Sequence, residues 1–188
     1  MTHRISSLIV VALLALSAVP ASAQDVEDVE GPRYRVDLDV FTPGWFVAAR
    51  DRGEPNGWDT VTFLSGQVGV RAAFRAGHGF FTDVSLSSGA LGPVYLLHEA
   101  GYLHRFRLQG DDARGLALEL QAGLSGGYWD GSVAGSGPIG GPNVAVSIDG
   151  RVDAFVLGLM IRHRVLYDGA RTQQMTSAIL RVTFGFWG

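Results

Sequence analysis

The C-terminal segment, from Ser177 to Gly188, alternates large apolar side chains with small or polar ones almost to its last residue. Its apolar positions are Ala178, Leu180, Val182, Phe184 and Phe186, and its other face carries Ser177, Arg181, Thr183 and Gly185. A period of two is typical of a β-strand whose two faces have different surroundings. Because a strand at the edge of a sheet exposes unpaired backbone groups, this pattern favours a sheet that closes into a barrel.

The same alternation recurs along the chain and predicts eight strands. We expect them at residues 34–41, 61–76, 80–88, 94–109, 116–125, 143–148, 151–167 and 177–188. The span 144–167 is too long for one strand, and we divide it at Asp149-Gly150 because Asp-Gly favours a two-residue hairpin turn. The expected connections are short on one side, at 77–79, 110–115 and 149–150, and include all the long ones on the other, at 50–59, 89–93, 130–143 and 168–174. This asymmetry is typical of outer-membrane β-barrels.

Residues 1–23 are predicted to be a signal peptide. A basic start and an apolar run, 8–16, precede the small residues Ala21-Ser22-Ala23 that a signal peptidase requires. The run is shorter than the roughly 18–20 apolar residues that a membrane-spanning helix needs. Residues 24–33 are acidic and apolar-poor, so we expect a flexible leader there and the barrel at 34–188.

Composition narrows the classes of protein that fit. The chain has no Cys, which argues against disulfides and a lipid-anchored cysteine. Without the signal peptide, 14 basic residues face 18 acidic ones, and a net charge of 14 − 18 = −4 argues against a nucleic-acid partner. Since no later apolar run has the length of a membrane helix, strands are the one means by which this chain can cross a bilayer.

Alternation fits two kinds of barrel. In an outer-membrane barrel the apolar face is outside, whereas a soluble lipocalin-like barrel has the opposite arrangement. The signal peptide and the aromatic residues near predicted strand ends, such as Tyr95 and Trp129, favour lipid outside. A soluble periplasmic ligand-binding barrel is the alternative.

The polar face carries both signs of charge, which predicts an ion-pair network in the lumen. Pairing is required there because an unpaired buried ion costs several kcal/mol. The expected network comprises Asp37, Asp39, Arg71, Arg75, Asp83, Glu99, Arg105, Arg107, Glu119, Arg162, Arg164 and Arg181. Eight strands enclose only enough room for side chains, so we expect no large open pore.

These features together resemble the small eight-stranded outer-membrane β-barrel proteins of Gram-negative bacteria. The resemblance implies an all-β fold, an antiparallel up-and-down transmembrane β-barrel with a polar filled lumen, in the cell outer membrane. It also implies a monomer in contact with outer-membrane lipid and lipopolysaccharide, inserted by the barrel-assembly machinery. In that family the last residue is typically Phe; here Phe186 is in phase, but Trp187 and Gly188 follow it.

Some small barrels modify lipid A, so a deacylase or acyltransferase is the enzymatic alternative. The available imidazoles, His98, His104 and His163, fall on the apolar face, whereas Ser85 and Ser125 fall on the polar face. A catalytic triad would need a break in register, and the His-x-Ser-Asn motif of the deacylases is absent. The balance favours a role without catalysis, and His104 is left without an explanation.

No metal or cofactor is expected from the sequence. Asp37 and Asp39 point to one side, but two carboxylates are too few for a Ca²⁺ site and nearby arginines can pair with them. The glycine pairs at 126–127 and 140–141 lack the Lys and Ser/Thr of a phosphate-binding loop.

Any recognition of a partner is expected in the loops at 50–59 and 130–143. Lipid-facing strands and a filled lumen leave only the outer loops free for binding. Arg50, Arg52 and Trp58 supply charge and an aromatic anchor in the first of them. The expected role is therefore structural or one of surface interaction.

Overall fold

The computed structural model describes residues 34–51, 58–74, 77–87, 94–110, 114–131 and 135–187. For residues 40–43, 45–51, 58–65, 131, 135 and 187 the backbone alone is described. The predicted signal peptide, 1–23, and the predicted leader, 24–33, lie outside the described residues. None of the described residues belongs to a helix long and apolar enough to cross a membrane.

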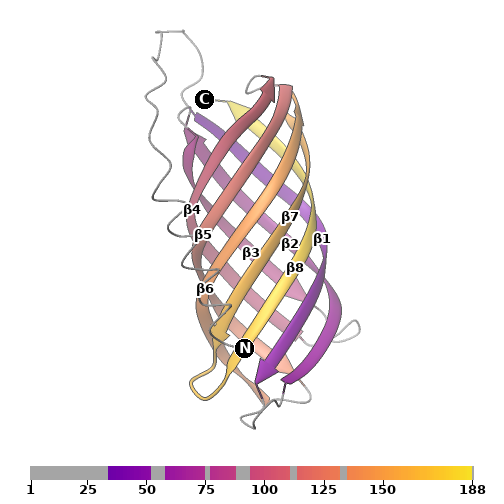
Figure 1. Ribbon diagram of the computed structural model, residues 1–188, viewed down its shortest axis with the longest axis vertical. Coiled ribbons are helices and arrows are strands. Elements are labelled where there is room, and N and C mark those ends of the chain that lie inside the picture. The colour runs from indigo at the N-terminus through magenta and orange to yellow at the C-terminus, as the bar shows by residue number, and fades with distance from the viewer. Residues whose placement is uncertain are drawn as a thin grey trace. The chain divides into compact units, whose positions relative to one another are not determined.

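Eight antiparallel strands form a closed barrel (Figure 1), which confirms the predicted fold class. They are β1 (Tyr34–Asp51), β2 (Trp58–Phe74), β3 (His78–Ser87), β4 (Val94–Gly110), β5 (Arg114–Gly131), β6 (Gly135–Val152), β7 (Phe155–Tyr167) and β8 (Thr172–Trp187). Each strand pairs with its neighbours in sequence, and β8 also pairs with β1 from Arg35↔Trp187 to Arg50↔Gln173. The C-terminal strand therefore has a partner on both sides.

The barrel has two ends, which we name by their connections. The turn end carries the connections β2–β3, β4–β5 and β6–β7, together with the start of β1 and the end of β8. The loop end carries the connections β1–β2, β3–β4, β5–β6 and β7–β8. Six strands are 16–18 residues long, and only β3 and β7 are shorter, with 10 and 13 residues. About 9–11 tilted residues are enough to cross a bilayer, and the six long strands are longer than that.

The predicted loop at 130–143 is wrong. β6 already begins at Gly135 and is paired with β5 from Gly131↔Gly135 onward, so this segment belongs to a strand ladder. One of its glycines is required there by a close backbone approach: a Cβ on Gly141 would overlap the carbonyl oxygen of Val165. The loop predicted at 50–59 also shrinks, because the β1–β2 ladder continues to Asp51↔Trp58.

The predicted turn at Asp149-Gly150 is wrong as well. Both residues are paired within β6, and the chain turns at Asp153-Ala154, where Asp153 has a φ of 53°. Asp is one of the few residues enriched in that left-handed region. The turn moves by four positions, from 149 to 153, and an even shift keeps the predicted faces on both sides of the segment 149–154. Within that segment Arg151 and Val152 exchange faces: Arg151 is buried inside and Val152 is exposed outside.

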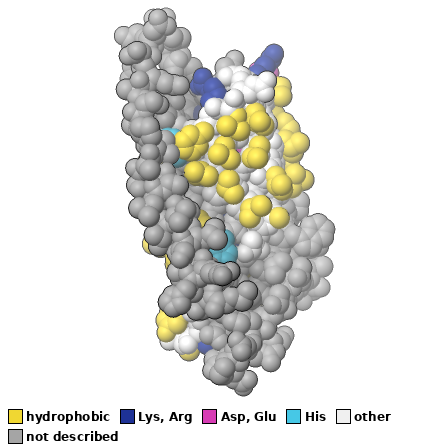
Figure 2. Space-filling view, viewed as in Figure 1, with side chains coloured by type: hydrophobic (Ala, Val, Ile, Leu, Met, Phe, Trp, Pro, Cys, Tyr) yellow, Lys and Arg dark blue, Asp and Glu magenta, His cyan; other side chains and the backbone are white. Residues whose placement is uncertain are grey.

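Alternation along the strands separates two kinds of surroundings. In β7, Phe155, Leu157 and Leu159 are exposed on the outer face, while Val156 and Met160 are buried inside. Hydrophobic side chains accordingly lie across the visible outer face of the described residues (Figure 2). The inward positions form the candidate site.

Candidate functional site

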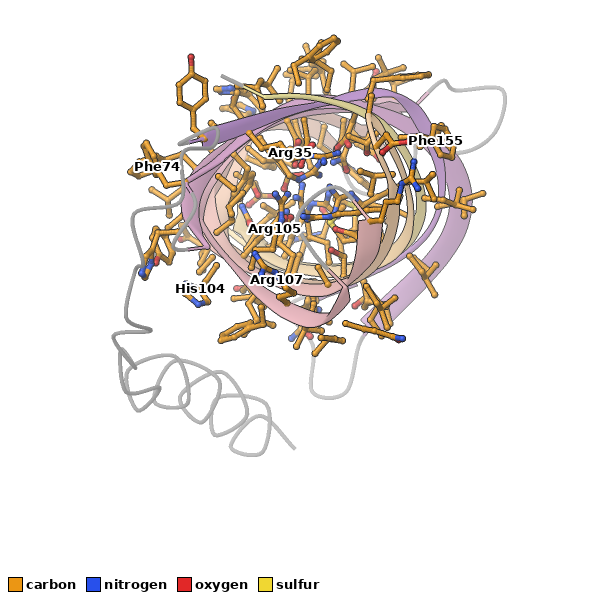
Figure 3. The ribbon with its side chains drawn as sticks, turned by 90° about the horizontal axis from the view of Figure 1, so that it is seen from above. Arg35, Phe74, His104, Arg105, Arg107 and Phe155 are labelled. Atoms are coloured by element: carbon orange, nitrogen blue, oxygen red, sulfur yellow. The ribbon has the colours of Figure 1, made fainter. Side chains whose placement is uncertain are left out.

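A layer of buried charges fills part of the lumen, and all eight strands contribute to it. We call it the charged layer; its members are Arg35, Asp37, Asp39, Arg71, Asp83, Glu99, Arg105, Glu119, Asp149, Arg151, Arg162, Arg164 and Arg181. Each member is less than 10% exposed. For Arg105 this fraction is that of the side chain, 8%. Seen along the barrel, Arg35 and Arg105 point into the ring while Phe74 and Phe155 point out of it (Figure 3).

Glu119 is the acceptor at the centre of one half of the layer. Arg105 donates to Glu119 Oε2 from Nε at 3.0 Å and from Nη2 at 2.7 Å. Arg71 Nε and Arg181 Nη1 each lie 3.4 Å from Glu119 Oε1. Gln121 Nε2 donates to the same Oε1 at 2.7 Å. Three arginines from three strands therefore depend on one carboxylate.

Arg181 also ties this half to β6 and, with its Nη2 3.8 Å from Asp39 Oδ1, to β1. Its Nη1 donates to both oxygens of Asp149, at 3.0 and 2.8 Å, and to Ser147 Oγ at 2.8 Å. Asp39 accepts from Arg71 Nη1 and, at 2.6 Å, from Thr183 Oγ1. The carboxylates thus receive several charge-assisted hydrogen bonds each, the strongest kind available to a buried ion.

Glu99 is the acceptor at the centre of the other half. Arg164 donates two hydrogen bonds to Glu99, from Nε at 2.8 Å and from Nη2 at 2.7 Å, and Arg162 Nη1 donates a third at 2.5 Å. Ser125 Oγ adds a hydrogen bond of 2.6 Å. Arg162 Nη2 reaches Asp83 Oδ2 at 2.6 Å.

Two groups join the halves into one network. Arg71 Nη2 lies 3.6 Å from Asp83 Oδ1, while its Nε approaches Glu119. Gln121 donates to Glu119 and accepts from Arg162 at 2.5 Å. Removing one partner of a buried pair costs about 3–5 kcal/mol because a charge is left uncompensated. The network therefore links strands that lie far apart around the ring and stabilises the barrel across its lumen.

Inward-facing glycines give the charged side chains their space. A Cβ on Gly158 would overlap the Asp149 carboxylate, and one on Gly69 would overlap the Asp83 carboxylate. These glycines are thus part of the charged layer's packing.

A second set of inward side chains is apolar. We call it the apolar layer; its members are Tyr95, Leu97, Trp129, Ile139, Ala145, Met160, Leu166, Met175 and Ile179. Several of them lie close to the loop end of their strands, and the rings of Tyr95 and Trp129 stack with centroids 6.1 Å apart. The predicted polar lumen therefore describes only one part of the interior. Tyr95 and Trp129, predicted at the lipid interface, are instead buried inside, with 1% and 6% exposed.

Most residues predicted for the network lie in the charged layer, with two exceptions. Arg75 lies outside the described residues. Arg107 is exposed near the turn end, beside a register shift between Arg107 and Gln109 in the β4–β5 ladder.

Three members of the charged layer are absent from the predicted network. Arg35 is absent from the predicted network, although it alternates with Asp37, to which its Nε donates at 2.5 Å. Asp149 falls in the predicted turn at 149–150 and Arg151 at the start of the predicted strand 151–167, so neither joins the predicted network. Placing the turn at Asp153 reveals their inward phase.

The residues predicted for loop recognition lie at the edge of the described region. Arg50 and Trp58 are at the ends of β1 and β2, opposite Asp59 and Asp51, with only their backbones described. Arg52 lies outside the described residues. Their role in recognition stays a prediction.

The imidazoles and the serine hydroxyls lie on opposite sides of the strand wall. His98 Nε2 is 2.8 Å from Thr82 Oγ1, and His163 Nδ1 is 2.9 Å from Thr176 Oγ1, both on the outer face. Ser125 faces the lumen, where its hydroxyl belongs to the charged layer. The described strands therefore bring no serine and histidine together as a catalytic pair.

Comparison with known proteins bears on the fold. No family model and no curated protein sequence matches the chain. Among solved structures, Ail, the attachment invasion locus protein of Yersinia pestis, superposes with a TM-score of 0.52 at 12% identity, covering 82% of this chain and 99% of that one. The N-terminal β-barrel domain of Pseudomonas aeruginosa OprF gives 0.51 at 14% identity, covering 84% and 100%. The fold is that of the small eight-stranded outer-membrane β-barrels, as the resemblance implied.

Proposed function

We propose that the chain is an integral outer-membrane β-barrel protein with a structural or surface-interaction role and without a large open channel. The observation that carries this proposal is the placement of side chains across the barrel wall. Large apolar residues such as Phe80, Leu124 and Val152 are 60–69% exposed on the outer face. The charges of the charged layer lie inside, paired with one another.

A lipid environment explains the outer face. Exposed large apolar side chains occur on all eight strands. Monomeric soluble proteins rarely expose contiguous apolar patches larger than a few hundred Å². A soluble lipocalin-like barrel requires the reverse distribution, with its apolar face turned inward. Hydrocarbon chains of a bilayer match the face that this barrel presents.

The filled lumen supports a closed barrel. Five arginines of the charged layer, Arg35, Arg71, Arg162, Arg164 and Arg181, are at most 1% exposed. The apolar layer adds bulk near the loop end. In planar bilayers we expect no large steady conductance from the pure monomer, and a well-defined nanosiemens channel would contradict the closed lumen.

Surface interaction is proposed for the loop end. Strands of 16–18 residues outreach the hydrocarbon region, so the β1–β2 end is free to contact lipopolysaccharide or a surface partner through Arg50, Arg52 and Trp58. Replacing residues 52–57 by a short Gly-Ser turn, together with Arg50→Ala and Trp58→Ala, should abolish surface binding without changing heat-modifiable gel mobility. Unchanged binding by that folded variant would remove this end from the proposal.

Cell fractionation tests the membrane location. The mature protein should enter the outer-membrane fraction, require detergent for release and depend on the barrel-assembly machinery for insertion. Recovery in the soluble periplasmic fraction without detergent would overturn the proposal.

A further inference from the structure

Two histidines face each other on the outer surface near the turn end, apart from the charged layer. His78, the first residue of β3, is paired directly with His104 of β4. Their Nδ1 atoms are 3.2 Å apart and their ring centroids 4.6 Å apart. The hydroxyl of Tyr102, on the same outer face of β4, contacts His78 Nδ1. Figure 3 shows His104 outside the ring of strands, away from the lumen arginines.

This pair differs from the other outward histidines. His98 and His163 each have a threonine hydroxyl as a hydrogen-bond partner. In this pair the two Nδ1 atoms lie within hydrogen-bond distance of each other, and His78 Nδ1 also contacts the Tyr102 hydroxyl. A neutral imidazole has one nitrogen with a lone pair that can bind a metal ion. A cation between the two Nδ1 atoms would replace these hydrogen bonds with bonds to both nitrogens.

The spacing matches that of a metal chelate. Zn²⁺ binds histidine nitrogen at about 2.0–2.1 Å in tetrahedral geometry, which places two ligand nitrogens about 3.3–3.4 Å apart. The observed 3.2 Å separation is therefore close to that of a bound pair. Little movement of either ring is needed to admit an ion.

The backbone around the pair is held in place. Gly77, which precedes His78, has a φ of 85° and donates its N–H to the Phe74 carbonyl at 2.9 Å. Its own carbonyl accepts from the N–H of Arg105, the residue after His104, at 2.8 Å. The first bond closes the β2–β3 turn, and the second joins the residue before His78 to the residue after His104. Ligands held by rigid neighbours lose little freedom on binding.

We propose that His78 and His104 form a binding site for a divalent transition-metal ion that clamps β3 to β4. Imidazole ligands suit Cu²⁺, Ni²⁺ and Zn²⁺, and the usual order of stability places Cu²⁺ first. The described residues contain no cluster of three or more His, Cys, Asp or Glu side chains. The two imidazoles are thus the protein ligands, with water and the neighbouring Tyr102 hydroxyl at the remaining positions. The site gives His104 a role and fastens the shortest strand of the barrel.

The test is a titration of the folded barrel, purified in detergent without a polyhistidine tag, with Cu²⁺ and with Zn²⁺ by calorimetry. We expect one ion per barrel. Removing a side chain that only hydrogen-bonds to a metal ligand weakens metal binding about 10–100-fold. Because His78→Ala and His104→Ala each remove a ligand itself, either should weaken binding at least about tenfold. His98→Ala and His163→Ala are matched controls, because they remove outward imidazoles that have other partners, and they should leave affinity unchanged.

Two further readouts separate metal binding from a folding defect. The Cu²⁺ electron paramagnetic resonance spectrum should show coupling to two imidazole nitrogens in the unaltered barrel and to fewer in either single variant. Saturating metal should raise the urea midpoint of the unaltered barrel and leave that of His104→Ala unmoved, with heat-modifiable mobility reporting that the variant is folded. Equal affinity in folded His78→Ala and in the unaltered barrel, or no bound ion at all, would overturn the proposal.

Discussion

The charged layer and the apolar layer fill the same lumen with side chains of opposite chemistry. In the charged layer, single carboxylates such as Glu119 and Glu99 each hold several arginines from other strands. In the apolar layer, Leu97, Leu166 and Met175 are completely buried without needing a specific partner. Apolar packing depends on volume, whereas a buried ion depends on the identity and geometry of every partner. The two layers should therefore respond differently to substitution.

The largest effect is expected at Glu119. Glu119→Leu leaves Arg71, Arg105 and Arg181 without their common acceptor, so stability should fall by at least about 3–5 kcal/mol. Urea unfolding of the barrel in lipid vesicles, followed by tryptophan fluorescence, measures this loss. The neighbouring outward substitution Leu120→Ile is the control and should cost less than about 1.5 kcal/mol. Equal losses in the two variants would mean that the network contributes little.

A truncation in the apolar layer should come next. Leu166→Ala should cost about 2–5 kcal/mol through the cavity it creates, while Leu166→Ile should cost less than about 1.5 kcal/mol because volume is kept. The corresponding conservative change in the charged layer, Arg164→Lys, should be worse than Leu166→Ile because it loses the two-donor grip on Glu99. The same unfolding assay compares all three, and a milder effect of Arg164→Lys would refute the distinction between the layers.

The pair Arg181 and Asp149 tests whether the charged layer acts through pairing. Each of Arg181→Met and Asp149→Leu leaves the other charge buried. The double variant should be more stable than the sum of the two losses predicts, by about 0.5–3 kcal/mol. Strict additivity in a double-mutant cycle would indicate that the two side chains stabilise the barrel independently.

The smallest effect is expected for an ion pair outside the lumen. Arg114 and Asp153 interact at 3.1 Å with side chains 71% and 61% exposed. Water screens such a pair, so Arg114→Met should change stability by less than about 1 kcal/mol. A loss as large as that of Glu119→Leu would show that burial is not what separates strong pairs from weak ones.

Much of this architecture can be predicted from the alternation of apolar and polar residues along the sequence. A period of two separates Leu180 and Phe184, which are exposed outside, from Arg162 and Glu99, which are buried inside, because the face of a residue within a strand depends only on the parity of its position. Closure followed from the apolar C-terminal strand, whose edge needs a partner. These inferences use local properties that a single chain carries.

The remaining features depend on which strands become neighbours. Asp149-Gly150 has the composition of a hairpin turn, yet Asp149 is held in the lumen by Arg181 from a strand 32 residues away. Glycines at 135–141 resemble a loop until β5 and β7 supply their partners. The apolar layer and the pairing of His78 with His104 likewise arise only from register between strands.

The central claim, that the outer face lies in lipid and the inner face is packed and dry, is tested most directly by two adjacent cysteines. The chain has none of its own. Ser147 is 2% exposed inside, and Ile148 is 52% exposed outside. In lipid vesicles, a spin label on Ile148→Cys should collide with oxygen and avoid a water-soluble nickel complex, while Ser147→Cys should resist water-soluble thiol reagents until urea unfolds the barrel. Collision of the Ile148→Cys label with the nickel complex, or ready labelling of Ser147→Cys in the folded barrel, would contradict the account.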